Sequence, residues 1–513
     1  MIRLLFVLLL AGCALSAAGQ QPADQGYYQE PYRPQLHFSP ARNWTNDPNG
    51  LVYLDGEYHL FYQYNPYGDT WGHMSWGHAV SRDLIAWTHL PLAIPEDSSH
   101  MIFSGSCVVD SRNSSGFAQK PGQVPMVAVY TAHLIPDKSR PDDYRQSQHI
   151  AYSLDHGRTW QKYAGNPVLD LNKKDFRDPK VFWYEAGKQW VMAVVLPHEH
   201  IVQFYGSPNL RRWTLLGSFG PAGDTGDIWE CPDLLQVPVA GHPGRTKWVL
   251  LTSTQTSMQY FVGDFDGHSF HNENPGSLIL RPDYGPDFYA AITFNHLPAG
   301  QAPVLLGWAN NWQYAQAIPT KPWRSAMSLP RQLHLQQFGD TWMLLEQPVA
   351  ALEKYRRGPA AAWNNLAVDP GTVRELPFHG QVLELDLQLD PGTTDSCGLR
   401  LAAGPDHYIS IGYARATRSL YVDRSRSGNT RFHDRVSAWL RAAAPLPGTR
   451  DSLRLHIVLD KSILEVYGDA GEVALTTQLF TDAGNDGVAL FATGGRARFA
   501  RLRAWHLRSA WTR

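Results

Sequence analysis

Three carboxylic acids in this chain stand in local settings that would fix their side chains. Asp47 lies in the segment WTNDPNG, residues 44–50, where the following proline restricts its backbone and Asn-Gly marks a turn. Asp178 stands between an arginine and a proline, and Glu230 stands in the segment WECPD. Carboxylates held in this way can act as nucleophile, general acid or general base. Each segment alone is better explained as a turn, an ion pair or a strand edge, but the three together favour one catalytic site.

The composition narrows the classes of protein to which the chain can belong. Its 513 residues indicate two or three domains, and its formal net charge of −2 argues against a nucleic-acid partner, which would need a basic surface. Only 18% of residues are charged, whereas there are 18 Trp, 23 Tyr and 20 Phe. Aromatic residues are typical of strands and of sites where flat rings contact sugars, although most of these rings must belong to the core.

The cysteines indicate neither a disulfide framework nor a metal site. Cys107, Cys231 and Cys397 are widely spaced and odd in number, and the chain has no Cys-x-x-Cys or His-Glu-x-x-His motif. We therefore expect free buried thiols and no metal site. An organic cofactor is not expected either.

The N-terminus has the pattern of an export signal. A short charged stretch is followed by an apolar run from Leu4 to Leu10, which is too short to span a bilayer stably. The segment LAGC, which ends at Cys13, resembles a bacterial lipobox, so that Cys13 would carry a lipid anchor. The competing interpretation is ordinary cleavage near residues 15–18. Either way we expect export, to the cell envelope or beyond, with membrane contact only through a lipid anchor.

Beyond residue 35 the pattern predicts strands almost throughout. Short aromatic or β-branched runs are separated by Gly, Pro, Asn and Asp, and long helical periodicity is missing. A degenerate repeat, in which a polar turn precedes an aromatic residue, recurs at Ser81–Trp87, Ser153–Trp160 and Ser207–Trp213, with a looser copy at Gly263–Phe270. Such recurrence is typical of β-propeller blades, although Ser-x-Asp turns are common in any β protein.

The pattern changes near residue 346. A short helix is possible between Val349 and Arg357, and strictly alternating segments follow at 382–389, 453–459 and 463–467. Alternation of this kind is typical of strands that are buried on one face, as in a β-sandwich.

Taken in order, the three acidic segments resemble the signature of glycoside hydrolase family 32, which comprises fructan hydrolases and invertases. The resemblance runs from about Leu36 to the end of the chain. Further segments that match the family are FYQYNP (61–66), WGH (76–78), FSGS (103–106), DYGPDFYA (283–290) and WRSAMSLPR (323–331).

The resemblance implies an all-β fold, in which a five-bladed β-propeller is followed by a C-terminal β-sandwich. We expect an export signal at 1–18, a tether at 19–34, the propeller catalytic domain at 35–345, a linker at 346–358 and the sandwich at 359–513.

The resemblance also implies roles for the acids. Asp47 matches the nucleophile, Glu230 matches the general acid and base, and Asp178 matches the acid that holds fructose hydroxyls, with Arg177 keeping it ionised. Asp47 must be ionised, and donors from the following turn would lower its pKa. Glu230 must start protonated, so its surroundings would have to raise its pKa.

Further residues of the sugar pocket are carried over from the family motifs. The residues expected to bind substrate are Asn46, Gln63, Trp71, Phe103, Ser104, Arg177 and Trp308. Packing between blades is a competing role for Trp308 and more so for Trp312. Four residues are expected in or behind the pocket as support: Asp283, Tyr284, Asp287 and Tyr289.

The expected activity is hydrolysis of terminal β-D-fructofuranosyl residues of levan or inulin, and of sucrose, through a covalent fructosyl-enzyme intermediate. A fructosyltransferase that uses the same intermediate is one alternative, and a non-catalytic fructan-binding surface protein is an alternative of another class. The sequence leaves open β-2,6 against β-2,1 linkage, exo against endo action and the oligomeric state.

Overall fold

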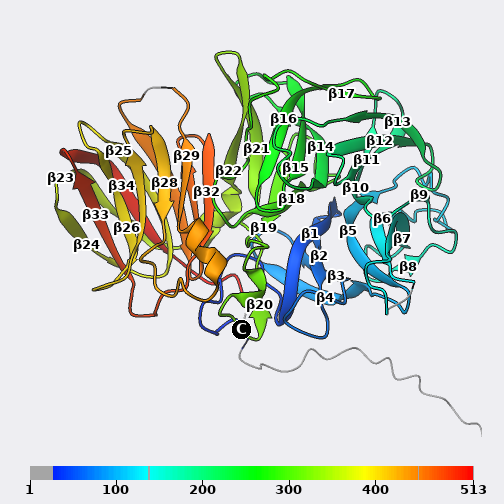
Figure 1. The fold of residues 1–513 in the computed structure, drawn as a ribbon, viewed down its shortest axis with the longest axis horizontal. Helices are drawn as coiled ribbons and strands as arrows, with labels where there is room; N and C mark the ends of the chain where they lie inside the picture. Colours follow the sequence, from blue (N-terminus) through cyan, green and yellow to red (C-terminus); the bar gives the residue numbers. More distant parts are fainter. Residues whose placement is uncertain (1–26, 137–138, 449, 512–513) are drawn as a thin grey trace, which may run out of the picture.

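The computed structural model describes residues 27–136, 139–448 and 450–511, and strands dominate them (Figure 1). The helical elements of this part are three short 3₁₀ helices, η1 (Ala315–Ala317), η2 (Ala350–Tyr355) and η3 (Asp434–Trp439). The all-β prediction is confirmed. The described part contains no helix that is long and apolar enough to span a membrane.

The described chain up to Pro348 forms five mainly antiparallel sheets (Figure 1). The first comprises β1 (Asn43–Leu54), β2 (Glu57–Tyr64), β3 (Ser75–Ser81), β4 (Trp87–Ile94) and the later β20 (Trp323–Arg324). The second comprises β5 (His100–Val109), β6 (Met126–Leu134), β7 (Arg145–Ser153), β8 (Gln161–Lys162) and β9 (Leu169–Lys173). The third comprises β10 (Arg177–Tyr184), β11 (Gln189–Leu196), β12 (Ile201–Ser207) and β13 (Thr214–Phe219). The fourth comprises β14 (Glu230–Pro238), β15 (Thr246–Ser253), β16 (Met258–Phe265) and β17 (Phe270–Asn272), and the fifth β18 (Tyr289–Thr293), β19 (Val304–Trp308), β21 (Arg331–Phe338) and β22 (Thr341–Pro348).

The first strands of these sheets surround a common axis. β1 contacts β5, β5 contacts β10, β10 contacts β14, β14 contacts β18, and β18 contacts β1 again. Apolar clusters fill the spaces between neighbouring sheets, for example Val181, Met192 and Val194 against Val127 and Val129. The fold is a β-propeller, and we interpret its five sheets as five blades.

The repeated turn of the sequence lies at the same place in several sheets, between the third and fourth strands. The indole N–H of Trp87 donates to the Leu84 carbonyl, and that of Trp213 donates to the Leu210 carbonyl. Trp160 makes the same bond to the carbonyl of Gly157. The aromatic residue of each repeat thus closes its own turn, which explains why the spacing recurs.

The strands from Arg356 to Leu507 form a β-sandwich of two six-stranded sheets (Figure 1). One comprises β23 (Arg356–Val368), β34 (Ala497–Leu507), β25 (Val382–Asp390), β30 (Leu453–Asp460), β31 (Ile463–Gly468) and β32 (Val473–Gln478). The other comprises β24 (Val373–His379), β33 (Gly487–Thr493), β26 (Ser396–Ala403), β27 (Ile409–Ala414), β28 (Ser419–Asp423) and β29 (Arg441–Pro445). Alternate residues of β25, from Leu383 to Leu389, are buried in the core between the sheets. The alternation that was read from the sequence is therefore confirmed.

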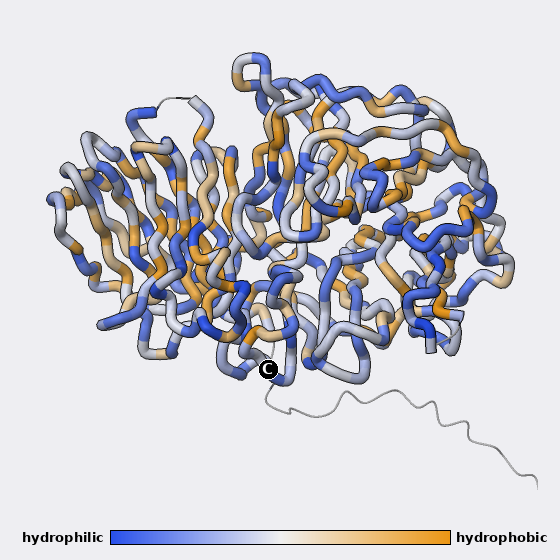
Figure 2. The backbone as a smooth tube through the Cα atoms, in the orientation of Figure 1, coloured by the Kyte–Doolittle hydropathy of each residue, from blue (hydrophilic) through white to orange (hydrophobic). Residues whose placement is uncertain are grey.

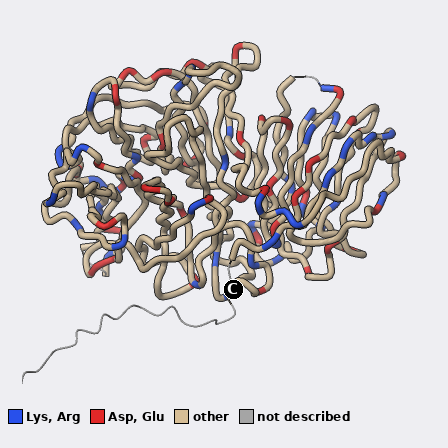
Figure 3. The backbone as a smooth tube through the Cα atoms, turned by 180° about the vertical axis from the view of Figure 1, so that it is seen from behind, with Lys and Arg blue, Asp and Glu red and all other residues tan. Residues whose placement is uncertain are grey.

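Apolar and polar residues are interspersed along the chain in both the propeller and the sandwich (Figure 2). Lysine and arginine are interspersed with aspartate and glutamate in both domains (Figure 3). This mixing agrees with the small net charge of the chain.

The described part of the expected tether is packed against the protein. Tyr28 stacks on Trp511 with 3.9 Å between ring centroids, and the buried Arg33 guanidinium donates to the carbonyls of Pro40 and Ala41. Segment 27–34 is therefore structured, because its aromatic and arginine side chains find partners there. The export signal and Cys13 lie outside the described residues.

Candidate active site

Each of the five inner strands, β1, β5, β10, β14 and β18, carries a β-bulge near its N-terminal end, and β1 has a second one between Asn49 and Val52. The register with the neighbouring strand shifts by one between Thr45 and Pro48 in β1 and between Ile102 and Gly105 in β5. The same shift occurs at 177–180 in β10, 230–233 in β14 and 289–292 in β18. A β-bulge bends its strand and redirects its side chains. These bulges turn residues of β1, β5, β10 and β14 towards one cavity, and Tyr289 of β18 contacts Glu230 there.

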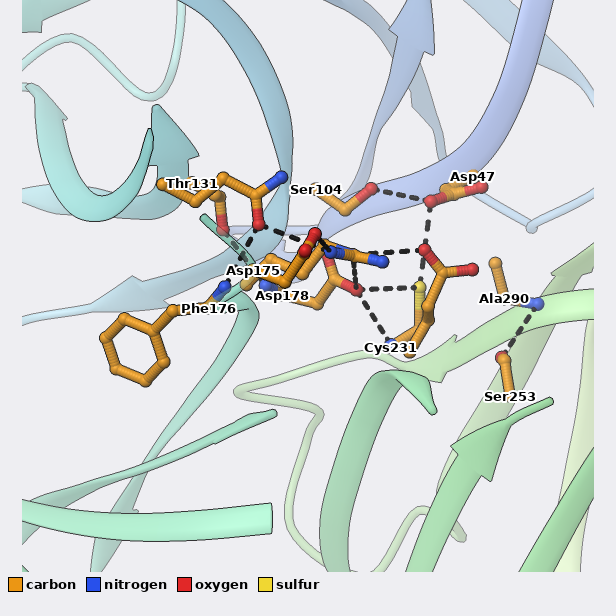
Figure 4. A network of polar contacts seen from close by, with 12 residues as sticks. Asp47, Ser104, Thr131, Asp175, Phe176, Asp178, Cys231, Ser253 and Ala290 are labelled. Carbon is orange, nitrogen blue, oxygen red and sulfur yellow. Dashed lines mark hydrogen bonds and ion pairs between the residues drawn. The ribbon is translucent and has the colours of Figure 1, made fainter. Parts of the chain in front are cut away.

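The three predicted acids meet there in one cavity of about 530 Å³. Asp47 comes from β1, Asp178 from β10 and Glu230 from β14, and all three line the cavity. Figure 4 shows the bonds that connect the Asp47 and Asp178 side chains to Cys231 between them.

Asp47 is buried and held by three side chains. The Ser104 hydroxyl donates to Oδ2 at 2.6 Å, the Asn46 amide donates to Oδ1 at 3.0 Å, and the Cys231 thiol lies 3.6 Å from Oδ2. Burial raises the pKa of Asp47, although the Ser104 and Asn46 bonds oppose this rise, and the nearby Glu230 charge adds to it. The expected lowering of this pKa by the following turn is therefore wrong, because burial outweighs the donors.

Asp178 lies on the other side of the Cys231 thiol from Asp47, in a left-handed backbone conformation with φ of 64°. Its Oδ2 accepts a 2.9 Å hydrogen bond from the Cys231 N–H, and the Cys231 thiol lies 3.7 Å away. Burial raises the pKa of Asp178 to about 7, although the Arg177 charge lowers it. Arg177 therefore does not keep this acid as fully ionised as the sequence suggested.

Glu230 is connected to two other groups of the site. The Arg177 Nε donates to Oε1 at 3.1 Å, and the buried Tyr289 hydroxyl donates to Oε2. Burial and the Glu230 charge raise the pKa of Tyr289 well above its usual range, so this phenol remains a donor at neutral pH.

Cys231 was expected only as a buried free thiol. Cys107, Cys231 and Cys397 are all free and buried, which confirms that expectation. Burial raises the pKa of Cys231 well above its ordinary value, and the Asp178 and Asp47 charges add to this effect. A neutral thiol thus separates the two carboxylates and can donate to either, a role that the sequence analysis missed.

Most of the predicted sugar-binding residues line the cavity. They are Asn46, Gln63, Trp71, Phe103, Ser104 and Arg177.

Trp308 is an exception and requires a correction. It is 0% exposed and packs between Trp44, Tyr289 and Trp312, whereas Trp312 lines the cavity. Trp308 ends the second strand of its sheet, behind the inner strand, and Trp312 lies in the loop that follows. The wall of the pocket is therefore Trp312, and Trp308 supports it from behind.

The expected supporting group is only partly correct. Tyr289 contacts Glu230, but residues 283–287 lie where the propeller meets the sandwich. Asp283 accepts from the Thr476 N–H and hydroxyl, and Asp287 accepts from Arg424 at 2.8 Å. Tyr284 donates its N–H to the Ala474 carbonyl. Asp283, Tyr284 and Asp287 therefore join the domains and do not line the cavity.

The structure adds residues that the sequence analysis did not identify. They complete the cavity outside the acids, and the main ones are His133, Tyr144, Gln146, Asp175, Ile228 and Gln255. The run Asp175-Phe176-Arg177-Asp178 could have drawn attention to Asp175, whereas His133 and Tyr144 carry no local signal. Among the described residues, no group of three or more His, Cys, Asp or Glu could hold a metal ion.

Comparison with protein families agrees with this geometry. The model of the glycosyl hydrolases family 32 N-terminal domain matches residues 37–348, and the model of the family 32 C-terminal domain matches residues 351–506. This chain belongs to glycoside hydrolase family 32. The resemblance seen in the sequence is thereby confirmed.

Relatives within the family cover nearly the whole chain. A levanase of Bacillus subtilis is 44% identical over 99% of this chain and 75% of its own length. An extracellular exo-inulinase of Aspergillus awamori is 38% identical over 94% of this chain and 96% of its own length.

Solved structures of the family share the fold. The crystal structure of an exo-inulinase from Aspergillus awamori superposes with a TM-score of 0.88 at 36% identity, covering 94% of this chain and all of that one. A β-fructofuranosidase from Schwanniomyces occidentalis, complexed with fructosyl-erythritol, gives a TM-score of 0.82 at 33% identity, covering 94% and 99%.

Proposed function

We propose that this family 32 enzyme is an exported β-fructosidase. It releases terminal β-D-fructofuranosyl units from fructans, and it also cleaves sucrose. The observation that carries the proposal is that Asp47, Asp178 and Glu230 line a single cavity in a chain of this family. Relatives named levanase, exo-inulinase and invertase support a fructoside as the substrate.

The geometry supports a double displacement with retention. Asp47 attacks the anomeric carbon, while Ser104 and Asn46 hold its carboxylate in position. Glu230 gives its proton to the leaving oxygen. The carboxylate oxygens that line the cavity stabilise the oxocarbenium-like transition state. Glu230 then takes a proton from the water that breaks the fructosyl–Asp47 bond. Asp178 and Arg177 bind fructose hydroxyls.

The same intermediate can pass its fructosyl group to water or to a sugar hydroxyl. Hydrolysis and transfer therefore differ in which acceptor reaches the cavity, and both need the same acids. A non-catalytic fructan-binding protein would not need an ionisable Asp47 beside a second carboxyl group.

Product analysis tests the proposal directly. Purified protein is incubated with levan, inulin and sucrose, and the released sugars are separated over time. We expect free fructose as the first product, with little intermediate oligosaccharide. Binding of these substrates without any release of fructose would reject hydrolysis, and longer oligosaccharide products would reject exo action.

Export is proposed from the N-terminal pattern and from relatives named extracellular. Lipid attachment at Cys13 is the more specific form of this proposal. Mass spectrometry of the mature N-terminus distinguishes a lipidated Cys13 from cleavage near residues 15–18, which would remove Cys13.

A further inference from the structure

One wall of the cavity carries four aromatic rings in a row. Trp71 meets Phe103 edge-on with 6.1 Å between ring centroids, and Phe103 stacks on His133 at 4.4 Å with 11° between the planes. Tyr144 continues the row at 4.7 Å from His133. All four side chains line the cavity. Trp71 and Phe103 are accounted for by the fructosyl pocket, whereas His133 and Tyr144 have no role so far.

His133 is held neutral and in one tautomer. Burial lowers its pKa to about 4, and the Arg177 charge contributes to this lowering. The Gln146 side-chain oxygen accepts from the Phe176 N–H at 3.1 Å and from Arg177 at 3.3 Å. The Gln146 amide nitrogen therefore faces His133 Nδ1, 3.3 Å away, and Nδ1 accepts. The imidazole proton is thus assigned to Nε2, which can donate to a hydroxyl.

Asp175 stands beside this wall with its carboxylate oriented. Arg177 Nη1 donates to Oδ1 at 2.6 Å, and the Tyr144 hydroxyl lies 3.1 Å from both oxygens. His198 Nε2 lies 3.2 Å from Oδ2. A carboxylate accepts up to about four hydrogen bonds, so Asp175 can also bind sugar hydroxyls. Arg177 is shared among Asp175, Asp178 and Glu230, so these carboxylates suit a neutral ligand whose hydroxyls donate to them.

The position of Glu230 decides which sugar unit this wall contacts. Arg177 bonds to Asp175 through Nη1 and to Glu230 through Nε at 3.1 Å, so Asp175 lies on the Glu230 side of the cavity. The proton donor must reach the oxygen between the fructosyl unit and its leaving group. The leaving group therefore departs on this side.

We propose that His133, Tyr144 and Asp175 bind the leaving-group sugar, the hexosyl unit next to the fructosyl residue that is released. The two rings contact the C–H face of this unit, and Asp175 and His133 Nε2–H bind its hydroxyls. This assignment rests on the proposed function and names the part of the site that selects the leaving group. His133 and Tyr144 contact the leaving group only, so their effect scales with its size.

Two substrates with different leaving groups test the assignment. Sucrose and inulobiose lose a hexose, whereas methyl β-D-fructofuranoside loses methanol, which is too small to cover the wall. We measure kcat/KM for each in wild type, His133→Ala and Tyr144→Phe. The disaccharide values are expected to fall about tenfold more than the methyl fructoside value in His133→Ala, with a smaller difference in Tyr144→Phe.

His149→Ala is the matched control. His149 is a half-buried histidine whose pKa burial also lowers to about 4, and its side chain does not line the cavity. This variant should keep the wild-type ratio between the substrates. Both kcat/KM values of a ratio are measured on one preparation, so a smaller folded fraction does not alter the ratio. If His133→Ala does not fold, Tyr144→Phe, which loses only one oxygen atom, provides the test.

The results distinguish a wrong leaving-group assignment from a wrong proposed function. Equal losses on all substrates in both variants would overturn the leaving-group assignment while hydrolysis stands. Failure of the wild type to cleave any of these fructosides would overturn the proposed function itself.

Discussion

Ser104 and Asp47 belong to different sheets, yet the Ser104 hydroxyl donates a 2.6 Å hydrogen bond to Asp47 Oδ2. Both residues lie at the bulges of adjacent inner strands, β5 and β1. This bond opposes the rise in the pKa of Asp47 that burial causes. The state of the proposed nucleophile therefore depends on contacts between sheets, and several measurable consequences follow from the surrounding geometry.

Replacing Ser104 should change the pH profile of catalysis. In Ser104→Ala the pKa of Asp47 rises further, because a donor to its ionised form is lost. The acidic limb of kcat/KM moves to higher pH, and kcat/KM at the optimum falls about tenfold. Ser106→Ala, two residues along the same strand, removes a hydroxyl that donates to the Pro179 carbonyl instead and should keep the acidic limb in place. If the acidic limb of kcat/KM stays in place in Ser104→Ala, Ser104 does not influence the ionisation of Asp47.

Replacing Trp308 should lower the stability of the protein, whereas replacing Trp312 should weaken substrate binding. Trp308→Ala leaves a large cavity in a buried cluster and should cost about 3–5 kcal/mol of unfolding free energy. Trp312→Ala removes part of the pocket wall and should raise KM for fructans with little change in Tm. Thermal unfolding and kinetics on both variants check this division. The reverse pattern would return Trp308 to the sugar site.

Glu230→Ala should lose turnover and keep binding. Loss of a general acid costs about 10²–10⁴-fold in kcat. Calorimetric affinity for a fructo-oligosaccharide should stay near that of wild type, since Asp178, Asn46 and Gln63 remain. Glu185→Ala changes an exposed glutamate and is the control. Near-normal turnover by Glu230→Ala would mean that the proton donor is another group.

His37 should make stability depend on pH above neutrality. It is buried between Asp460 and Glu465 of the sandwich, at 2.8 and 3.1 Å. Burial opposes its charge, but the hydrogen bonds to these carboxylates prevail and raise its pKa from 6.5 to about 9. The stabilisation, on the order of 3 kcal/mol, is present below pH 6.5 and is lost as the pH rises through about 9.

Thermal unfolding between pH 6 and 9.5 tests this dependence. Wild-type Tm should fall across the range, and the Tm of His37→Gln should start lower and vary less. Burial raises the pKa of Glu346 to about 8, so the Tm of His37→Gln should still fall with rising pH, but less steeply than the Tm of wild type. The exposed His73 is the control, since His73→Gln should keep the full wild-type slope. Equal slopes in wild type and His37→Gln would refute the role of His37.

Local pattern was sufficient for the strands and for most of the pocket. Alternation in β25, the polar turns before Trp87 and Trp213, and the motif around Asp47 depend on neighbours in the chain, which a sequence displays directly. The roles of Trp308 and Trp312 could not be separated in this way. Four residues apart, they differ only in whether a strand end or a loop carries the ring.

The function of the segment 283–290 could not be read from local pattern either. Its acids look like pocket residues, but Asp283 and Asp287 pair with Thr476 and Arg424, almost two hundred and more than a hundred residues further along. A contact of that kind leaves no trace in local spacing. His133 and Tyr144, which carry no local signal either, were missed for the same reason.

The sequence by itself determined the all-β class and the family, and it singled out the three acids that line one cavity, because these follow from ordered local motifs. Only the tertiary structure decided how the acids meet, since the bulges of five separate strands must align before their side chains face one axis. It also decided the pKa shifts of Asp47 and Asp178, because their burial and their distances from Ser104 and Cys231 arise from packing between sheets. Burial, which long-range packing produces, outweighs the opposing contributions of the chain neighbours Asn46 and Arg177 to these pKa values.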